Sequence, residues 1–150
     1  MPANRSAIGN RVLVVLGMAW TSPNSVLGLL LGVAGMPLGA RVQWQASVQA
    51  LVFRRWPWPW AGGGALTLGN VIIYTGDELA TPCLTYAHRA GRSVDNAILL
   101  ADHERAHVYQ YMVLGPLFLP VYLLCGGVSV RNSFERAADR YALSGRGWWP

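Results

Sequence analysis

The residues best suited to chemistry form the pattern His-Glu-Arg-Ala-His at positions 103–107. This pattern falls inside a segment that we predict to be helical from about Val94 to Met112, after a possible cap at Ser93. Because an α-helix turns about 100° per residue, His103 and His107 project from one face, a single turn apart. That separation suits two imidazole ligands of one tetrahedral zinc ion, at Zn–N distances of about 2.0–2.1 Å.

The glutamate inside the pattern predicts the reaction. Glu104 projects to the side of the histidine pair, where its carboxylate would accept a proton without binding the metal. Zinc lowers the pKa of bound water towards about 7, so a neighbouring carboxylate can complete the deprotonation at neutral pH. We therefore expect Glu104 to be the catalytic base of a hydrolytic reaction. A solvated helix face with local His and Glu contacts is the alternative that the pattern alone leaves open.

A second pair of carboxylates lies downstream, on another predicted helix that starts near Asn132 or Ser133 and ends before Gly145. A catalytic zinc site uses three protein ligands and one open position, and two histidines with one glutamate are a known set. Glu135 would complete that set. Asp139, one turn later, would accept the free ring N–H of a ligating histidine and so fix its tautomer. The alternative is a solvated surface pair.

These two motifs carry a resemblance to a known family. His-Glu-Arg-Ala-His followed by Phe-Glu-Arg-Ala-Ala-Asp-Arg-Tyr-Ala-Leu (134–143) is similar to the gluzincin metallopeptidases, whose second motif is Glu-x-x-x-Asp. It looks closest to the membrane-embedded branch that includes the CAAX prenyl-peptidase and the heat-shock membrane protease. The string from His103 to Leu124 also resembles a group of small uncharacterised bacterial membrane proteins. The resemblance covers about residues 93–143 and implies a Zn²⁺ site with His103, His107 and Glu135 as ligands. The chain is much shorter than those proteases.

Other candidate residues carry weaker signals. His88 could contact substrate, and Tyr141 could act as an electrophilic tyrosine, although an incidental loop histidine and a packing tyrosine are the simpler interpretations. No Gly-x-Ser-x-Gly motif supports a serine hydrolase. Cys83 and Cys125 form no metal-binding Cys-x-x-Cys spacing, and their pairing is left open.

Composition favours a membrane-associated protein. The chain is 53% hydrophobic and 13% charged, which is more apolar than an ordinary soluble domain. Its net charge of +5 comes from twelve scattered arginines with no lysine, and no nucleic-acid-binding motif accompanies them. We therefore expect anionic membrane lipid, rather than nucleic acid, to be the partner of this charge. The other expected partner is a peptide or protein substrate, and the expected location is the bacterial inner membrane.

The N-terminal region contains no charged residue between Arg11 and Arg41. It is long enough to cross a bilayer, but Thr21-Ser22-Pro23-Asn24 breaks it with turn or helix-start chemistry, with Ser22 or Asn24 as a possible cap. One kinked span, a shallow helical hairpin and a cleaved signal peptide all fit this pattern, and a buried pair of core helices is the alternative to a membrane segment. We expect residues 1–40 to form an apolar membrane anchor and residues 41–150 to form the zincin-like domain.

The remaining elements must position the metal ligands. Period-two alternation predicts a strand over Val42–Val52, and Leu66–Tyr74 predicts a second strand. The apolar run 113–130 contains two prolines and a double glycine. A single crossing of the membrane by this run would place His103 and Glu135 on opposite sides, so we expect it to fold back or to lie at the interface.

The predicted fold class is α+β, a minimal zincin-like domain with an active-site helix, a second ligand helix and a small sheet. The predicted activity is peptide-bond hydrolysis, with Glu104 activating zinc-bound water. The rival hypothesis is a non-catalytic, zinc-stabilised membrane protein, in which the metal only ties two helices together. A membrane scaffold without metal is a third.

Overall fold

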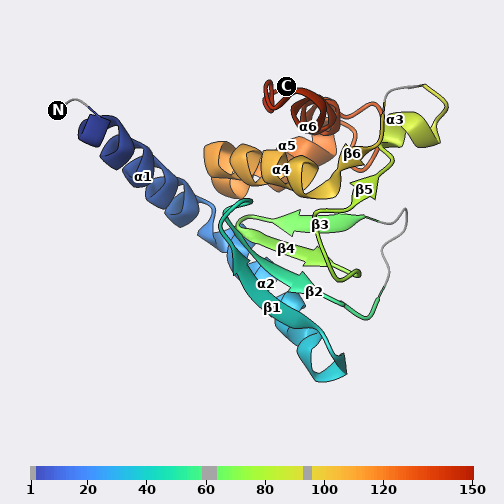
Figure 1. Cartoon of the computed structure of the whole chain (residues 1–150), viewed down its shortest axis with the longest axis horizontal. Helices are drawn as coiled ribbons and strands as arrows, with labels where there is room; N and C mark the ends of the chain where they lie inside the picture. The colour runs from blue at the N-terminus through green and yellow to red at the C-terminus, as the bar shows by residue number, and fades with distance from the viewer. Residues whose placement is uncertain (1–2, 59–63, 93–95) are drawn as a thin grey trace.

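The computed structural model describes residues 3–58, 64–92 and 96–150, with side chains from Asn10 onwards. The chain is a mixed α and β protein, which confirms the predicted α+β class (Figure 1). The helices are α1 (Ala3–Trp20), α2 (Ser22–Ala34), α3 (Tyr86–Arg89), α4 (Leu100–Leu114), α5 (Phe118–Leu124) and α6 (Ser133–Ser144), with short 3₁₀ turns η1 (Met36–Leu38) and η2 (Gly115–Leu117). The strands are β1 (Arg41–Gln45), β2 (Ala50–Arg54), β3 (Ala65–Leu68), β4 (Val71–Tyr74), β5 (Pro82–Cys83) and β6 (Ile98–Leu99).

The main sheet has four strands in the order β1-β2-β4-β3. The two hairpins, β1–β2 and β3–β4, are antiparallel, and β2 joins them by pairing in parallel with β4. Strand β3 is therefore at one end of the sheet, next to α4. A separate two-stranded ribbon, β5–β6, leads directly into α4.

Helices cover both faces of this sheet. On one face, Leu29 and Leu31 of α2 pack against a cluster that includes Phe53 and Ile73. On the other face, Val108 of α4 joins a cluster with Ile72 and other strand residues. Alternating strand side chains therefore enter two different apolar layers, because successive residues point to opposite faces.

Helix α6 packs on the side of α4 that faces away from the sheet. The contact uses alanines, since Ala106 of α4 and Ala138 of α6 are fully buried in one cluster. Small side chains let the backbones of two packed helices approach closely. This close approach brings the polar residues of the two helices together.

The structure corrects both strand predictions. Val42–Val52 is not one strand but a hairpin, which turns at residues 46–49 and places Gln49 at φ 56°. Leu66–Tyr74 is likewise a hairpin, with its turn at Gly69-Asn70. In Val42–Val52 the period-two alternation continues through the turn, and in Leu66–Tyr74 the apolar character continues on both sides of the turn, so neither pattern marked the break.

The helix that carries the His-Glu-Arg-Ala-His pattern begins later than predicted, at Leu100. Ser93, the predicted cap, lies outside the described residues, and residues 98–99 form β6 because they pair with β5. The second ligand helix agrees with the prediction: α6 spans Ser133–Ser144, and the Asn132 side chain accepts the Phe134 backbone N–H as its N-cap.

The run after α4 folds back, as predicted. Gly115 ends α4 at φ 55° and ψ −131°, a conformation that glycine adopts without steric cost. The chain then forms η2 and α5, and Asn132 donates two hydrogen bonds to the Tyr122 and Gly127 carbonyls in the return loop. The result is that α6 lies beside α4, so Glu135 and the two histidines are on the same side of the protein.

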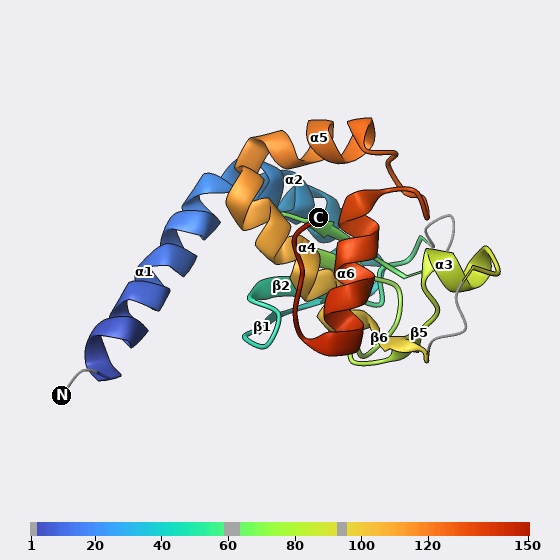
Figure 2. The ribbon, with the colours of Figure 1, turned by 90° about the horizontal axis from the view of Figure 1, so that it is seen from above.

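The N-terminal apolar region forms two helices, bent by 67° at the Thr21 break. Ser22 is the first residue of α2 and makes no cap; Asn24 instead donates a buried hydrogen bond to the Gly115 carbonyl at 2.9 Å. In Figure 2, α1 projects away from the folded body, whereas α2 lies against it. This bent pair and the stretch Leu100–Leu124 are the described helical segments apolar and long enough to cross a membrane, and the anchor stays a prediction.

Candidate metal centre

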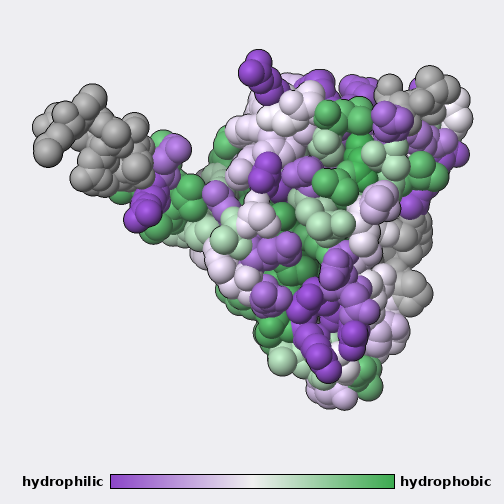
Figure 3. Space-filling view, viewed as in Figure 1, coloured by the Kyte–Doolittle hydropathy of each residue, from purple (hydrophilic) through white to green (hydrophobic). Residues whose placement is uncertain are grey.

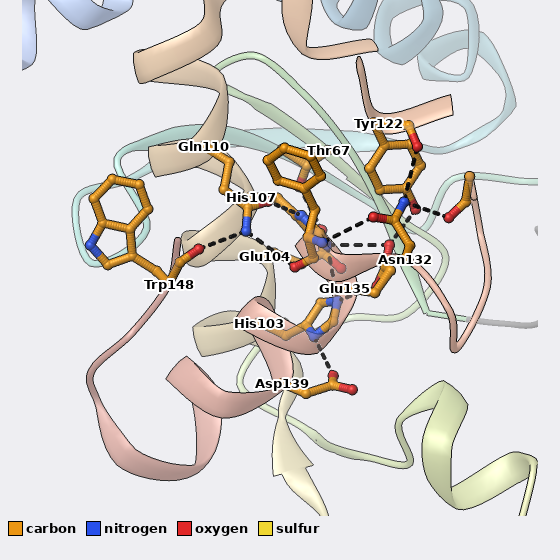
Figure 4. A network of polar contacts seen from close by, with 12 residues as sticks. Thr67, His103, Glu104, His107, Gln110, Tyr122, Asn132, Glu135, Asp139 and Trp148 are labelled. Carbon is orange, nitrogen blue, oxygen red and sulfur yellow. Dashed lines mark hydrogen bonds and ion pairs between the residues drawn. The ribbon is translucent and has the colours of Figure 1, made fainter. Parts of the chain in front are cut away.

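The two histidines of α4 and the glutamate of α6 converge in the interior (Figure 4). His103 Nε2 lies 3.1 Å from His107 Nε2 and 3.2 Å from Glu135 Oε2. His107 Nε2 lies 3.6 Å from the other Glu135 oxygen, Oε1. All three residues are buried, and one ligand atom from each lies within 4.8 Å of the others. The structure therefore brings the three predicted ligands together in a group that could bind a metal ion.

The outer ring nitrogens show where the protons lie. Gln110 donates its side-chain N–H groups to the carbonyls of Phe134 and Trp148, at 3.1 and 2.7 Å. Its oxygen therefore faces His107 Nδ1 at 2.8 Å as an acceptor, so Nδ1 carries the hydrogen. His103 Nδ1 lies 2.9 Å from the Asp139 carboxylate, which is also an acceptor, as predicted for Asp139.

It follows that the two inner nitrogens are free of hydrogen when the rings are neutral. Their lone pairs then face each other and the Glu135 carboxylate, of which Oε2 is buried and accepts no hydrogen bond within the described part of the chain. Three electron-pair donors this close repel one another unless a proton or a cation lies between them. Two imidazole nitrogens and one carboxylate oxygen form a donor set that fits a divalent metal ion.

Without a metal, protons take its place. Burial opposes the charged form of His103, but the contacts with Asp139 and Glu135 outweigh it and raise the pKa of this ring well above its ordinary value. Burial likewise opposes the charge on His107, while the Glu135 charge raises the pKa of that ring. For Glu135, burial is outweighed by the charge of His107 and by the histidine contacts, so its pKa is lowered. The group thus holds positive charge readily, whether as protons or as a cation.

Glu135 is also held from a third element. The Tyr122 hydroxyl on α5 donates a hydrogen bond to Glu135 Oε1, which orients the carboxylate towards the histidines. Burial and the neighbouring Glu135 charge raise the pKa of Tyr122, so the hydroxyl keeps its proton at neutral pH. The fold-back at Gly115 is what places α5 over the ligands.

Glu104 lies beside the group without belonging to it, as the helical spacing predicts. It is buried, and its Oε2 accepts a hydrogen bond of 2.5 Å from the Thr67 hydroxyl of β3. One carboxylate oxygen is therefore fixed by the sheet edge, while the carboxylate lines the same cavity as the metal group. The Thr67 hydroxyl therefore positions the Glu104 carboxylate beside the three potential ligands.

A cavity of about 130 Å³ opens onto the three candidate ligands and Glu104. Its walls come from both strands of the β5–β6 ribbon, from β3, from the helices α3, α4, α5 and α6, and from the loops before α3 and after α5. Most of the lining is apolar, with Leu84, Phe118, Leu119 and Val128 among the wall residues. Tyr86 also lines it, and burial together with the Glu135 charge raises the pKa of this tyrosine to about 12.

The weaker candidates lie elsewhere. His88 caps the short helix α3, with Nδ1 2.8 Å from the Thr85 hydroxyl, and it is not part of the cavity lining. Tyr141 packs between α4 and α6, with the Arg105 guanidinium 5.3 Å from its ring centre, also away from the cavity. Cys83 and Cys125 are free thiols, and burial raises the pKa of Cys83, which lines the cavity.

Three residues that support the site were not predicted from the sequence: Thr67, Gln110 and Tyr122. Thr67 is the one hydroxyl in an otherwise apolar strand, a signal that could have drawn attention to it. Gln110 follows His107 by three residues, so helical spacing alone places it within reach. Tyr122 gave no signal, because its contact depends on how the run 113–130 folds back.

The whole chain was compared with protein-family models, with curated proteins and with solved structures. None of the three comparisons found a match. The geometry of the site and the two sequence motifs therefore carry the functional argument.

Proposed function

We propose that this protein is a zinc-dependent peptidase. The observation that carries the proposal is the convergence of three potential ligand atoms, from His103, His107 and Glu135, in a buried group beside a cavity. Two imidazoles and one carboxylate are the ligand set of known catalytic zinc sites, in which a fourth position stays open to water or substrate. The similarity of both motifs to the gluzincins, together with helix α4 lying under a sheet edge, supports a zincin-like domain.

The chemistry divides between the metal and the chain. Zinc, when bound, would supply an electrophile that polarises a peptide carbonyl and acidifies water. Glu104 accepts a proton from the attacking water and returns it to the leaving amine. Thr67 holds the Glu104 carboxylate in place through its hydroxyl, and Asp139 and Gln110 fix the tautomers of the two histidines.

The walls of the cavity suit an extended peptide. Residues 64–67, at the start of β3, line it, and in the described part of the chain no further strand pairs with the outer edge of β3. An extended segment can add to such an edge through main-chain hydrogen bonds, with its side chains directed into pockets. The apolar lining favours apolar substrate side chains beside the cleaved bond.

A metal-stabilised protein without activity is the second candidate. It is favoured by the position of the ligands, because the metal would join α4 to α6 and so stabilise the fold directly. Glu104 separates the two functions, since a purely structural metal does not need a carboxylate that lines a cavity beside the ligands without joining them.

The test compares two isosteric substitutions. Glu104→Gln removes the base and keeps the shape, whereas Glu78→Gln makes the same change at an exposed position. An enzyme should keep its zinc in both variants but lose hydrolysis of a peptide library by about 10²–10⁴-fold in Glu104→Gln alone. Zinc content is measured by elemental analysis on the same preparations.

Two results would contradict the proposal in different ways. Zinc bound tightly by a wild-type protein that cleaves nothing would favour the structural metal. Hydrolysis that is unchanged in Glu104→Gln would show that Glu104 is not the base.

A further inference from the structure

An exposed apolar surface lies on the side of the molecule away from the viewer in Figure 1. There α2 lies behind the sheet and α5 behind α4, and Figure 2 shows both helices along the same edge. We define the apolar face by the exposed aliphatic side chains of these two regions. They are Val26, Leu27, Leu30 and Val33 on α2, and Val113, Leu117, Leu123, Leu124 and Val128 around α5.

The apolar face contrasts with the opposite side of the protein. Figure 3 shows hydrophilic side chains gathered over strands β1 and β2, on the side that faces the viewer. On α2 the exposed positions 26, 27, 30 and 33 fall on one face of the helix, while Asn24, Gly28 and Gly32 on the other are buried. Exposed Leu124 (88%) and Leu30 (66%) are unusual for a soluble monomer when they belong to a larger patch.

Charge identifies what the apolar face contacts. Neither chain segment that forms it contains a charged Asp, Glu, Lys or Arg residue: the first runs from Val12 to Ala40 and the second from Val108 to Val130. Arginines flank these segments in the sequence at three of their four ends, at Arg11, Arg41 and Arg131, and the protein carries a net charge of +5. An uncharged apolar surface on a positively charged protein matches a bilayer with anionic head groups.

Tryptophans lie where such a surface would meet the head groups. Trp20 is half exposed at the joint of α1 and α2. Near the other end of α2, Trp56 donates to the Leu31 carbonyl and stacks edge-to-face on the half-exposed Trp58. Indole rings prefer this interfacial depth, because they are apolar with one polar N–H.

The geometry excludes a simple crossing by α2. Its thirteen residues span about 20 Å at 1.5 Å per residue, short of the roughly 30 Å hydrocarbon core. One side of α2 is also covered by the sheet, which lipid cannot replace. The stretch Leu100–Leu124 contains the buried His103 and Glu104 and is broken at Gly115, so it is not a continuous span either.

We propose that the apolar face inserts into a single leaflet of an anionic membrane, with the protein bound to one side of the bilayer. The cavity then opens beside the membrane surface, because Leu119, Tyr122 and Val128 of the α5 region line it. Resting on the proposed function, this placement makes the substrate a peptide segment close to the membrane.

Vesicle flotation tests the inference with matched substitutions. Leu30→Glu and Leu124→Glu place a charge on the apolar face, and Leu143→Glu makes the same change at an exposed position of α6. The wild-type protein and Leu143→Glu should float with phosphatidylcholine–phosphatidylglycerol vesicles, and less with phosphatidylcholine alone. Leu30→Glu and Leu124→Glu should each weaken binding at least about tenfold, the cost of losing one buried leucine.

A labelling experiment tests the single leaflet. In a Cys83→Ser, Cys125→Ser background, Asn10→Cys and Ser144→Cys each provide one thiol. A membrane-impermeant maleimide added outside the vesicles should react with both variants. Protection of either thiol until the vesicles are lysed would show a spanning topology and overturn the inference.

Two further outcomes would also overturn it. Equal flotation of all variants would show that the apolar face does not contact lipid. A vesicle-independent dimer that dissociates on Leu30→Glu or Leu124→Glu would show that a second copy of the chain covers it. Flotation and labelling require neither zinc nor hydrolysis. The proposed function can therefore fail while membrane binding is confirmed, and membrane binding can fail while the proposed function is confirmed.

Discussion

The metal centre and the apolar face are built on different physical terms. At the candidate metal centre, each potential ligand has a polar partner: Asp139 of α6 for His103, Gln110 on the same helix for His107, and Tyr122 of α5 for Glu135. The side chains that define the apolar face are aliphatic, so they form no hydrogen bonds and contribute only apolar surface area. A hydrogen bond is lost when one of its two atoms is removed. The free energy from apolar surface instead falls in proportion to the area that a substitution removes.

Substitutions should therefore have different effects in the candidate metal centre and on the apolar face. The site is a network in which an unpaired partner is buried and costly. The face already exposes its side chains to water in the isolated protein, so a substitution there should leave folding unchanged and, under the proposed membrane contact, weaken lipid binding alone. The following predictions compare the two regions.

The largest effect is expected from the loss of a ligand. His103→Ala should reduce zinc affinity by more than about 100-fold, because losing a ligand costs more than losing an outer partner, which costs about 10–100-fold. His88→Ala is the matched control, since His88 lies outside the metal group. Competition with a chelating indicator measures both affinities. Equal affinities would show that His103 is not a ligand.

An outer partner should give the next effect. Asp139→Asn removes the charge that faces His103 Nδ1 and should weaken zinc binding by about 10–100-fold. Asp77→Asn makes the same change at an exposed salt bridge with Arg55 and should leave the affinity unchanged. An unaltered affinity in Asp139→Asn would reduce this carboxylate to a structural contact. The same indicator competition provides the measurement.

Acid should weaken metal binding at this site, and it should leave the binding of the apolar face to vesicles unchanged. The raised pKa values of His103 and His107 mean that protons compete with the metal, so affinity should fall by about tenfold per pH unit for each proton displaced. Calorimetry in buffers of different ionisation enthalpy counts the protons released. Flotation should show no matching loss, and a parallel loss would mean that the two regions are coupled.

The shifted pKa values of His103, His107 and Glu135 also predict how the stability of the metal-free protein depends on pH. The histidines, with raised pKa values, stabilise it fully below their unfolded value of 6.5, and this contribution is lost as pH rises through their folded values. Glu135, with a lowered pKa, stabilises it above its unfolded value of 4.5, and this contribution is lost as pH falls through the folded value. Thermal unfolding after chelation should therefore show greatest stability between these two values.

The smallest effect is expected on the apolar face. Leu30→Ser should change the free energy of unfolding by less than about 0.5 kcal/mol, because the side chain is already exposed. Val108→Ser, at a fully buried position of α4, should destabilise by about 2 kcal/mol or more. Denaturant titration without lipid provides both values. A large loss in Leu30→Ser would mean that the face is covered by protein.

The sequence predicted the convergence of His103, His107 and Glu135 better than the sheet beside them. The histidine spacing depends only on helix geometry, and the Glu135–Asp139 spacing repeats the same one-turn relation. The fold-back of 113–130 could be predicted as well, because the ligands cannot otherwise meet. Each of these predictions rests on the spacing of residues within one helix or on the requirement that the chain between two ligands must bring them together.

The missed features depend on tertiary contacts. The turn at 46–49 contains no glycine, proline, asparagine or aspartate, and Ser47 is its one weak turn signal, which the alternation of Val42–Val52 outweighed. Gly69-Asn70 did carry a turn signal, which the continuous apolar pattern of Leu66–Tyr74 outweighed. The hydrogen bond from Thr67 to Glu104 joins residues 37 apart in the chain, and no spacing rule reaches that far.

The order of the elements also sets an order of assembly during synthesis. The cluster under α2 is drawn entirely from residues 29–73, so the sheet and its first covering helix can pack before α4 and α6 are made. The last ligand, Glu135, leaves the ribosome about 60 residues later, some 3–12 s at typical rates of about 5–20 residues per second. The nascent chain thus presents α2, which carries part of the apolar face, first and acquires the complete candidate metal-binding group only near the end of translation. Under the proposed function, zinc would therefore bind only after the sheet and α2 have had time to pack together.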